Sequence, residues 1–253
     1  MVALGVRHRW SGAPFRVGRA TNGSHHPCPD CSDSMSNTRS SIAPSRDQVV
    51  ALVLCGGQSR RMGSDKSQLE LGGQTLLGKT AGLMERIAGT VWLACGSEER
   101  YADLGYRLVL DKRSGGGPLE GLRAGLEELD REWLLAVACD MPALEEGHFT
   151  PLLDAAHEAD VDLVHYRGED GNEPLCALYR RTVLPAVRTS LEDGVHRMDA
   201  FWGGRREDGQ PLVVRALAKN LEWLRSGNPF HNINTPEDLD SNSWVHPASE
   251  ESA

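Results

Sequence analysis

"VVALVLCGGQSRRMGSDK", residues 49–66, places an apolar run directly before a glycine-rich and basic loop. The first six residues are all apolar and three of them are β-branched, which is typical of a strand that is covered on both faces. Gly56 and Gly57 follow this run, and a backbone without Cβ atoms can approach a ligand closely. Arg60, Arg61 and Lys66 bring positive charge to the same turn, and guanidinium groups match the geometry of phosphate. The stretch therefore predicts a strand that leads into a loop for a triphosphate.

Two better-known phosphate motifs do not fit this loop. A P-loop needs the pattern G-x-x-x-x-G-K-[ST], but here Lys66 stands three residues after Gly63. The dinucleotide fingerprint G-x-G-x-x-G is not present either. A plain strand-to-helix turn with solvated arginines stays open as an alternative.

The residues that follow alternate between strand and helix patterns. Hydrophobic periodicity predicts these further elements: strands over 90–95, 106–111, 133–140 and 161–166, and helices over 75–87 and 117–129. This alternation indicates an α/β fold with a mostly parallel sheet and helices on both faces. Such sheets bind ligands at the carboxyl ends of their strands. Asp111 and Asp140 end two of the strands, so we expect both at the same edge as the loop, although turn chemistry alone also favours aspartate.

The composition argues against several classes of protein. A formal net charge of −9 disfavours a general nucleic-acid surface. No apolar run approaches the ~20 residues that a membrane helix needs, and the N-terminus lacks the apolar core of a secretory signal. Four of the six cysteines lie in apolar stretches, which is typical of buried, reduced thiols in a cytoplasmic protein.

Both ends of the chain differ from its middle. Residues 1–47 are rich in Ser, Arg, Asn, His and Pro without a period, so we expect a disordered tail. "HHPCPDC" (25–31) could form half of a zinc site, but no second C-x-x-C follows at zinc-ribbon spacing. We expect one domain over residues 48–240 and a flexible C-terminal tail over 241–253.

The loop also carries a resemblance to a known family. "LCGGQSRRMGSDKSQLEL" (54–71) closely resembles the L-x-G-G-x-S-x-R-M-G-x-D-K signature of molybdenum cofactor guanylyltransferases. Further segments resemble that family in order: its G-P-L-x-G segment in "GGPLEGL" (116–122), its metal-binding C-D-x-P in "ACDMP" (138–142), its substrate-side loop in "GNEPLCALYRR" (171–181), and its closing motif in "NINTPEDL" (232–239). The chain departs from the family at Ala94 and Cys95, where some members place an asparagine.

The resemblance implies a three-layer, Rossmann-like nucleotidyltransferase fold and a set of site residues. Those implied to bind the nucleotide are Leu54, Cys55, Gly56, Gly57, Lys66, Asp111 and Asp140. Those implied to act in catalysis are Arg61, Lys66 and Asp140, with Asp140 holding Mg²⁺. Asn232 and Asn234 are implied to face the pterin, although capping and turn formation remain open for both.

The implied activity is transfer of GMP from GTP to molybdopterin, which yields the guanine dinucleotide cofactor and pyrophosphate. One alternative is a cytidylyl- or sugar-phosphate nucleotidyltransferase of the same fold, but those groups tend to show Ala-Ala-Gly at residues 55–57. Another is a regulatory nucleotide-binding module, which would be expected to have lost Lys66 or Asp140. The expected partners are GTP, molybdopterin, and the proteins that insert molybdenum or accept the cofactor. We expect a cytoplasmic monomer that binds neither nucleic acid nor membrane.

Overall fold

The structure is a computed structural model that describes residues 44–56, 65–158, 160–233 and 238. The chain divides into two units, residues 1–39 and 40–253, and every described residue belongs to the second. The predicted N-terminal tail lies outside the described residues up to residue 43, and the predicted C-terminal tail lies outside them entirely.

The strands and helices follow one another as the apolar pattern suggests. The strands are β1 (Val49–Leu54), β2 (Glu70–Leu71), β3 (Gln74–Thr75), β4 (Thr90–Ala94), β5 (Arg107–Val109), β6 (Trp133–Ala138), β7 (Leu163–Gly168), β8 (Gly171–Arg180) and β9 (Val214–Ala218). The α-helices are α1 (Leu76–Ile87), α2 (Gly117–Glu128), α3 (Thr150–Ala155), α4 (Leu184–Glu192) and α5 (Leu221–Ser226). Short 3₁₀ turns are η1 (Arg46–Gln48), η2 (Lys66–Gln68), η3 (Ala102–Leu104), η4 (Glu146–His148) and η5 (Arg181–Val183).

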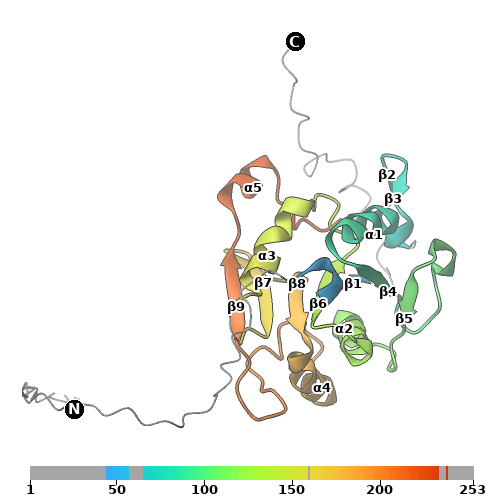
Figure 1. Cartoon of the computed structure of the whole chain (residues 1–253). Coiled ribbons are helices and arrows are strands. Elements are labelled where there is room, and N and C mark those ends of the chain that lie inside the picture. The colour runs from blue at the N-terminus through green and yellow to red at the C-terminus, as the bar shows by residue number, and fades with distance from the viewer. Residues whose placement is uncertain (1–43, 57–64, 159, 234–237, 239–253) are drawn as a thin grey trace, which may run out of the picture. The chain divides into compact units, whose positions relative to one another are not determined.

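A seven-stranded sheet in the order β5-β4-β1-β6-β8-β7-β9 lies at the centre of this unit (Figure 1). β1 pairs in parallel with both β4 and β6, and β5 and β9 are also parallel to their neighbours. β8 runs antiparallel to β6 and β7. The sheet is therefore mostly parallel, as predicted.

The interpretation of residues 171–181 as a substrate-side loop is wrong for most of their length. Residues 171–180 form β8, and Cys176, Ala177, Leu178 and Tyr179 are buried in it. These side chains alternate between the two cores, because successive residues of a strand point to opposite faces. Their burial on both faces makes this segment part of the sheet.

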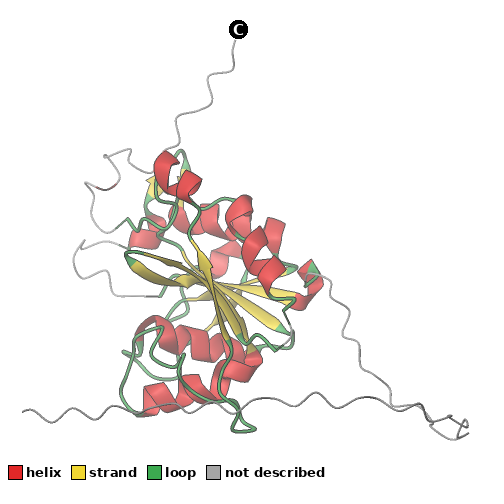
Figure 2. Cartoon of the chain, turned by 90° about the vertical axis from the view of Figure 1, so that its left-hand side faces the viewer, coloured by secondary structure: helices red, strands yellow, loops and turns green. Residues whose placement is uncertain are grey.

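Helices cover both faces of the sheet, as Figure 2 shows edge-on. In β1, Val49, Ala51 and Val53 belong to the core cluster that includes residues of α1 and α3. The alternate residues Val50, Leu52 and Leu54 belong to the cluster that includes residues of α2 and α4. Burying one such side chain contributes about 1.5–3 kcal/mol, so β1 is anchored from both sides. This confirms the three-layer α/β fold.

Two glycines bring α2 close to the carboxyl-terminal half of β1. A Cβ atom on Gly125 would lie 2.7 Å from a Leu52 methyl group. A Cβ atom on Gly121 would lie 3.0 Å from a Leu54 methyl group and 3.3 Å from the Ala94 Cβ. Because larger residues would push the helix away, the glycines let α2 begin beside the edge at which β1 ends.

Candidate active site

The loops that follow β1, β4, β5 and β6 are joined by backbone hydrogen bonds. The N–H groups of Cys55 and Gly56 donate to the Ala94 carbonyl at 3.0 and 2.8 Å. The Asp111 N–H donates to the Gly96 carbonyl at 2.8 Å. The Cys139 N–H donates to the Leu54 carbonyl at 3.3 Å. Four chain segments that are distant in sequence are thereby held at one edge of the sheet, as the strand order predicts.

Gly56 has a packing reason to lack a side chain. A Cβ atom at this position would lie 2.4 Å from the Gly96 nitrogen and 2.8 Å from the Cys95 carbonyl carbon. Real Cβ atoms do not approach backbone this closely, so the loops after β1 and β4 fit together only with glycine here. Of the other predicted loop residues, Gly57 and Arg61 lie outside the described residues.

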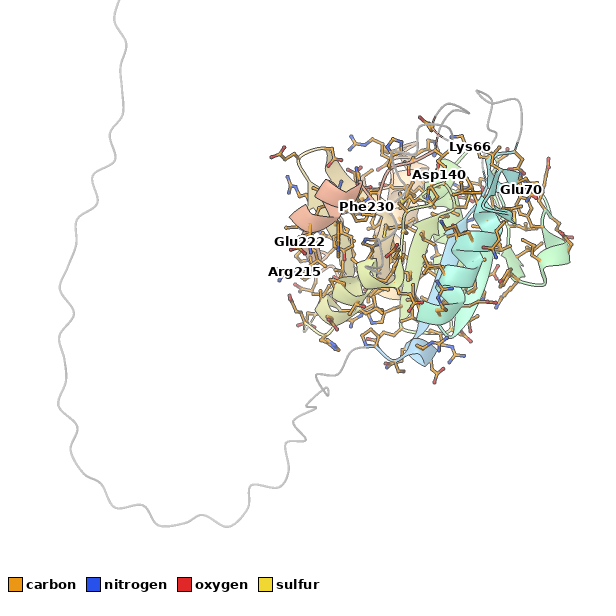
Figure 3. All side chains as sticks on the ribbon, turned by 90° about the horizontal axis from the view of Figure 1, so that it is seen from above. Lys66, Glu70, Asp140, Arg215, Glu222 and Phe230 are labelled. Carbon is orange, nitrogen blue, oxygen red and sulfur yellow. The ribbon has the colours of Figure 1, made fainter. Side chains whose placement is uncertain are left out.

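Lys66 opens the short η2 turn at the same edge. Asp65 caps this turn, because its carboxylate accepts from the Ser67 N–H at 3.1 Å and from the Ser67 hydroxyl at 2.8 Å. Lys66 and Asp140 lie near one another when the molecule is seen from above (Figure 3). In agreement with this view, the positive charge of Lys66 acts on Asp140 and favours its ionised form. A cation and an acidic side chain thus lie near one another at this edge of the sheet.

The carboxylate of Asp140 has an oxygen atom to which the described residues donate no hydrogen bond. Its Oδ1 atom is buried and has no hydrogen-bond partner among the described residues. Burial raises the pKa of Asp140 above its ordinary value, and the charge of Lys66 opposes this rise. A buried carboxylate oxygen of this kind is a ligand that a hard cation would satisfy.

The described residues contain no group of three or more His, Cys, Asp or Glu side chains that could hold a metal ion. Mg²⁺ is usually bound through one or two carboxylates together with substrate phosphates and water, and the buried Oδ1 atom of Asp140 is one such oxygen. Asp140 is therefore a suitable ligand for Mg²⁺ that arrives with a nucleotide.

Asp111 is the second carboxylate at this edge with an unsatisfied oxygen. Its Oδ1 atom is buried without a hydrogen-bond partner in the part of the chain that the structure describes. Burial raises the pKa of Asp111 to about 6, Glu120 adds to the rise, and Arg123 opposes it. A group with this environment can accept hydrogen bonds from a ligand that brings its own donors.

The closing motif joins the site through the backbone of Asp140. The Ile233 N–H donates to the Asp140 carbonyl at 2.9 Å, and Ile233 is fully buried. Asn232 precedes Ile233 and is therefore held beside the acidic loop. Asn234 lies outside the described residues, so of the predicted pterin-facing pair the structure places Asn232.

Arg100 and Tyr101 both contact Asp65, and neither was predicted from the sequence as a site residue. They stand in "SEERY" (97–101), which reads as an ordinary solvated loop. The sequence offers only a weak sign of their role, which is that a tyrosine follows shortly after a strand that ends at the ligand-binding edge. Their role depends on how the loop after β4 folds back, which periodicity does not report.

Comparison with known proteins agrees with this geometry. Residues 51–219 match the model of the MobA-like NTP transferase domain. A probable molybdenum cofactor guanylyltransferase of Pelotomaculum thermopropionicum is 33% identical over 201 residues, which cover 76% of this chain and 90% of the relative. Another protein of that name, from Nostoc sp., is 34% identical over a stretch that covers 76% of this chain and 89% of the relative.

Solved structures with low sequence identity share the fold. Molybdopterin-guanine dinucleotide biosynthesis protein A of Archaeoglobus fulgidus superposes with a TM-score of 0.61 at 22% identity, covering 76% of this chain and 95% of its own. The 2-C-methyl-D-erythritol 4-phosphate cytidylyltransferase of Thermus thermophilus superposes with a TM-score of 0.53 at 15% identity. The superposition covers 79% of this chain and 96% of that protein. In the described residues, no helix has the length and apolar character to cross a membrane. On its sequence match and its fold, the chain belongs to the MobA-like NTP transferase family and is a nucleotidyltransferase.

Proposed function

We propose that this enzyme transfers GMP from GTP to molybdopterin, with release of pyrophosphate. The observation that supports the proposal is that Lys66, Asp111 and Asp140 lie at one edge of the sheet. In the described part of the chain, the Oδ1 atoms of both aspartates are buried without a hydrogen-bond partner. The relatives named as molybdenum cofactor guanylyltransferases, at 33–34% identity, support guanylyl transfer in particular.

The reaction requires a phosphate oxygen of the pterin to attack the α-phosphorus of GTP as the bond to pyrophosphate breaks. The attacking oxygen is already anionic, so a strong general base is not needed. The difficulty is to bring two anions together and to stabilise the charge that develops on the leaving group. Lys66 supplies positive charge for this purpose, and Arg61 of the same loop supplies more.

Asp140 would hold Mg²⁺ through its buried Oδ1 atom. When bound, the metal ion neutralises and aligns phosphate oxygens. Lys66 would hold the triphosphate beside Asp140, so that the α-phosphorus is positioned for in-line attack. Asn232, held beside Asp140, would contact the pterin substrate, and Asn234 would join it.

Asp111 would select the nucleotide. Guanine carries an N1–H and an exocyclic amine, and a carboxylate can accept from both. The unsatisfied Oδ1 atom of Asp111 has the chemistry for this contact, although the same oxygen could also accept from a ribose hydroxyl. CTP lacks the donor pair, and each acceptor left unpaired costs roughly 1–3 kcal/mol.

Two further points belong to this proposal. The enzyme works in the cytoplasm, where the four described cysteines, all free thiols, stay reduced, and it works as a monomer. Its product passes to the proteins that insert molybdenum and to the enzymes that use the cofactor. Size-exclusion chromatography with light scattering would test the monomer.

The experiment that tests the activity compares GTP, CTP, ATP and UTP with molybdopterin and Mg²⁺, and measures kcat/KM for each. We expect GTP to give the highest value and the guanine dinucleotide to be the product. Equal or higher efficiency with CTP would reject guanylyl transfer in favour of the cytidylyl alternative. Absence of turnover with all four would instead favour the regulatory module.

A further inference from the structure

The carboxylate of Asp65, next to Lys66, is surrounded by donors. Besides the two hydrogen bonds from Ser67, it accepts one from the Tyr101 hydroxyl, and Arg100 Nη1 lies 3.3 Å from its Oδ2. The Ser67 hydroxyl also lies 2.8 Å from the Tyr101 hydroxyl. Asp65, Ser67 and Tyr101 therefore form a ring of three polar side chains within hydrogen-bond distance of one another, and Asp65 and Ser67 flank Lys66 in the sequence.

Arg100 ties this ring to the sheet. Its Nη2 atom donates to the Cys95 carbonyl at 3.0 Å and reaches the Cys55 carbonyl at 3.5 Å. One guanidinium thus joins the Asp65 turn to the residues that follow β1 and β4. Its planar fork of donors allows this, whereas a lysine ammonium is a single point of charge.

Tyr101 reaches the ring from an unusual backbone conformation. Its φ of 65° lies in the left-handed region, which residues other than glycine seldom adopt. Such conformations persist where surrounding contacts determine them, and they are concentrated at functional sites. The contacts of the Tyr101 side chain with Asp65 and Ser67 are contacts of this kind.

The charges within the ring are stable near neutral pH. Burial raises the pKa of the Asp65 carboxyl, but hydrogen bonds from Tyr101 and Ser67 and the charge of Arg100 outweigh it, so the net pKa is lowered. Burial and the hydrogen bond to Asp65 raise the pKa of the Tyr101 hydroxyl. The phenol therefore remains a donor and the carboxylate remains an acceptor.

We propose that Arg100 and Tyr101 are positioning residues that hold the Asp65–Ser67 turn so that Lys66 meets the triphosphate beside Asp140. The inference rests on the proposed function and adds to it the residues that orient its lysine. A lysine side chain is flexible, so fixing its backbone reduces the entropy lost when it meets the phosphates. Neither residue needs to touch the substrate for this effect.

The test replaces Tyr101 by phenylalanine and uses Tyr106→Phe as the matched control. The Tyr106 hydroxyl also donates to a carboxylate, Glu85, at 3.0 Å, but that pair is exposed, and neither of its residues takes part in the hydrogen bonds of Asp65. We expect Tyr101→Phe to lower kcat/KM for GTP by about 10–100-fold, as for loss of a hydrogen bond to a charged group. Tyr106→Phe should change it less than about twofold, and both proteins should keep their Tm within a few degrees.

A second comparison separates positioning from general damage. In a Lys66→Ala background, where the oriented side chain is gone, Tyr101→Phe should change kcat/KM by less than about threefold, because both changes act through one interaction. Arg100→Lys should behave like Tyr101→Phe in both backgrounds.

Equal losses with and without Lys66, or equal effects of Tyr101→Phe and Tyr106→Phe, would overturn the inference while leaving guanylyl transfer intact. If the enzyme uses another triphosphate in place of GTP, the proposed function fails and the same cycle decides the inference with that nucleotide. If it turns over none, both fail.

Discussion

Replacing Asp111 by asparagine is expected to make the protein more stable and less active. The Asp111 carboxyl has its pKa raised to about 6 from an ordinary value of 3.8, because it is half-buried and faces Glu120. That gap corresponds to about 3 kcal/mol of unfavourable free energy for the ionised form in the folded state. Since the side chain is only half-buried, solvent screening reduces the figure to about 1–2 kcal/mol.

The effect should depend on pH in a defined direction. Because the pKa is raised, the protonated carboxyl favours the folded state. Its contribution to the free energy of unfolding is fully present below about pH 3.8 and is lost as the pH rises through about 6. Asparagine does not ionise and avoids this loss. The gain in stability of Asp111→Asn should therefore be largest at pH 7–8 and vanish near pH 4. For a domain of this size, about 1–2 kcal/mol raises the Tm by about 2–8 °C.

Activity should change in the opposite sense. The variant loses the charged acceptor proposed for guanine, so kcat/KM for GTP should fall by about 10–100-fold, while kcat/KM for CTP should fall less. Calorimetric unfolding at pH 7.5 and pH 4, together with the triphosphate assay, measures both effects. Asp103→Asn, at an exposed aspartate in η3, is the control and should alter neither. An unchanged or lowered Tm for Asp111→Asn at pH 7.5 would refute the burial argument, and an unchanged ratio of GTP to CTP efficiency would refute the guanine contact.

Asp140→Asn should reduce Mg²⁺-dependent turnover by roughly 10²–10³-fold with the fold intact, and normal activity in a titration at limiting Mg²⁺ would contradict the ligand assignment. Gly56→Ala should cost about 1–3 kcal/mol in urea unfolding, because its Cβ would lie 2.4 Å from backbone. Gly82→Ala in α1, where a Cβ would meet nothing within 4 Å, should instead stabilise by about 0.5–1 kcal/mol, and equal effects would refute the packing argument. Deleting residues 1–43 should leave the Tm and turnover unchanged, whereas deleting residues 1–48 should lower the Tm, because the turn before β1 accepts hydrogen bonds of 2.8 and 3.1 Å from the rest of the unit. A lower Tm after the shorter deletion would show that the N-terminal tail docks.

The strands around the site could be predicted because their signal is local. β1 has the bounds that its apolar run predicts, and β4 and β6 begin where predicted. β7 begins two residues later than predicted, at Leu163. Nearly all residues of these strands are buried, on both faces of the sheet, so almost every position contributes to the pattern. The carboxylates Asp111 and Asp140 could then be assigned to one edge, since parallel strands all end on the same side.

β8 escaped prediction because of its polar first half and its proline. Pro174 cannot donate to a ladder and argues against a central strand. The structure accommodates it where the register between β7 and β8 shifts, between the pairs His165–Ala177 and Tyr166–Glu173. Pairing with β6 begins only at Cys176. Proline is tolerated there because its backbone is not required to donate a regular hydrogen bond between strands. Whether such a bond is required depends on how the partner strands pair.

The sequence by itself determined the strand and loop that carry Lys66, the edge at which the acidic residues gather, and the family to compare. These follow from residue types at fixed spacing along one segment. Only the tertiary structure decided that Gly56 must be glycine, that Arg100 and Tyr101 hold Asp65, and that Asp111 ionises with difficulty. The physical reason is that close backbone contact, hydrogen bonding between loops and loss of solvent each depend on segments that are distant in the chain and become neighbours only when the sheet has formed.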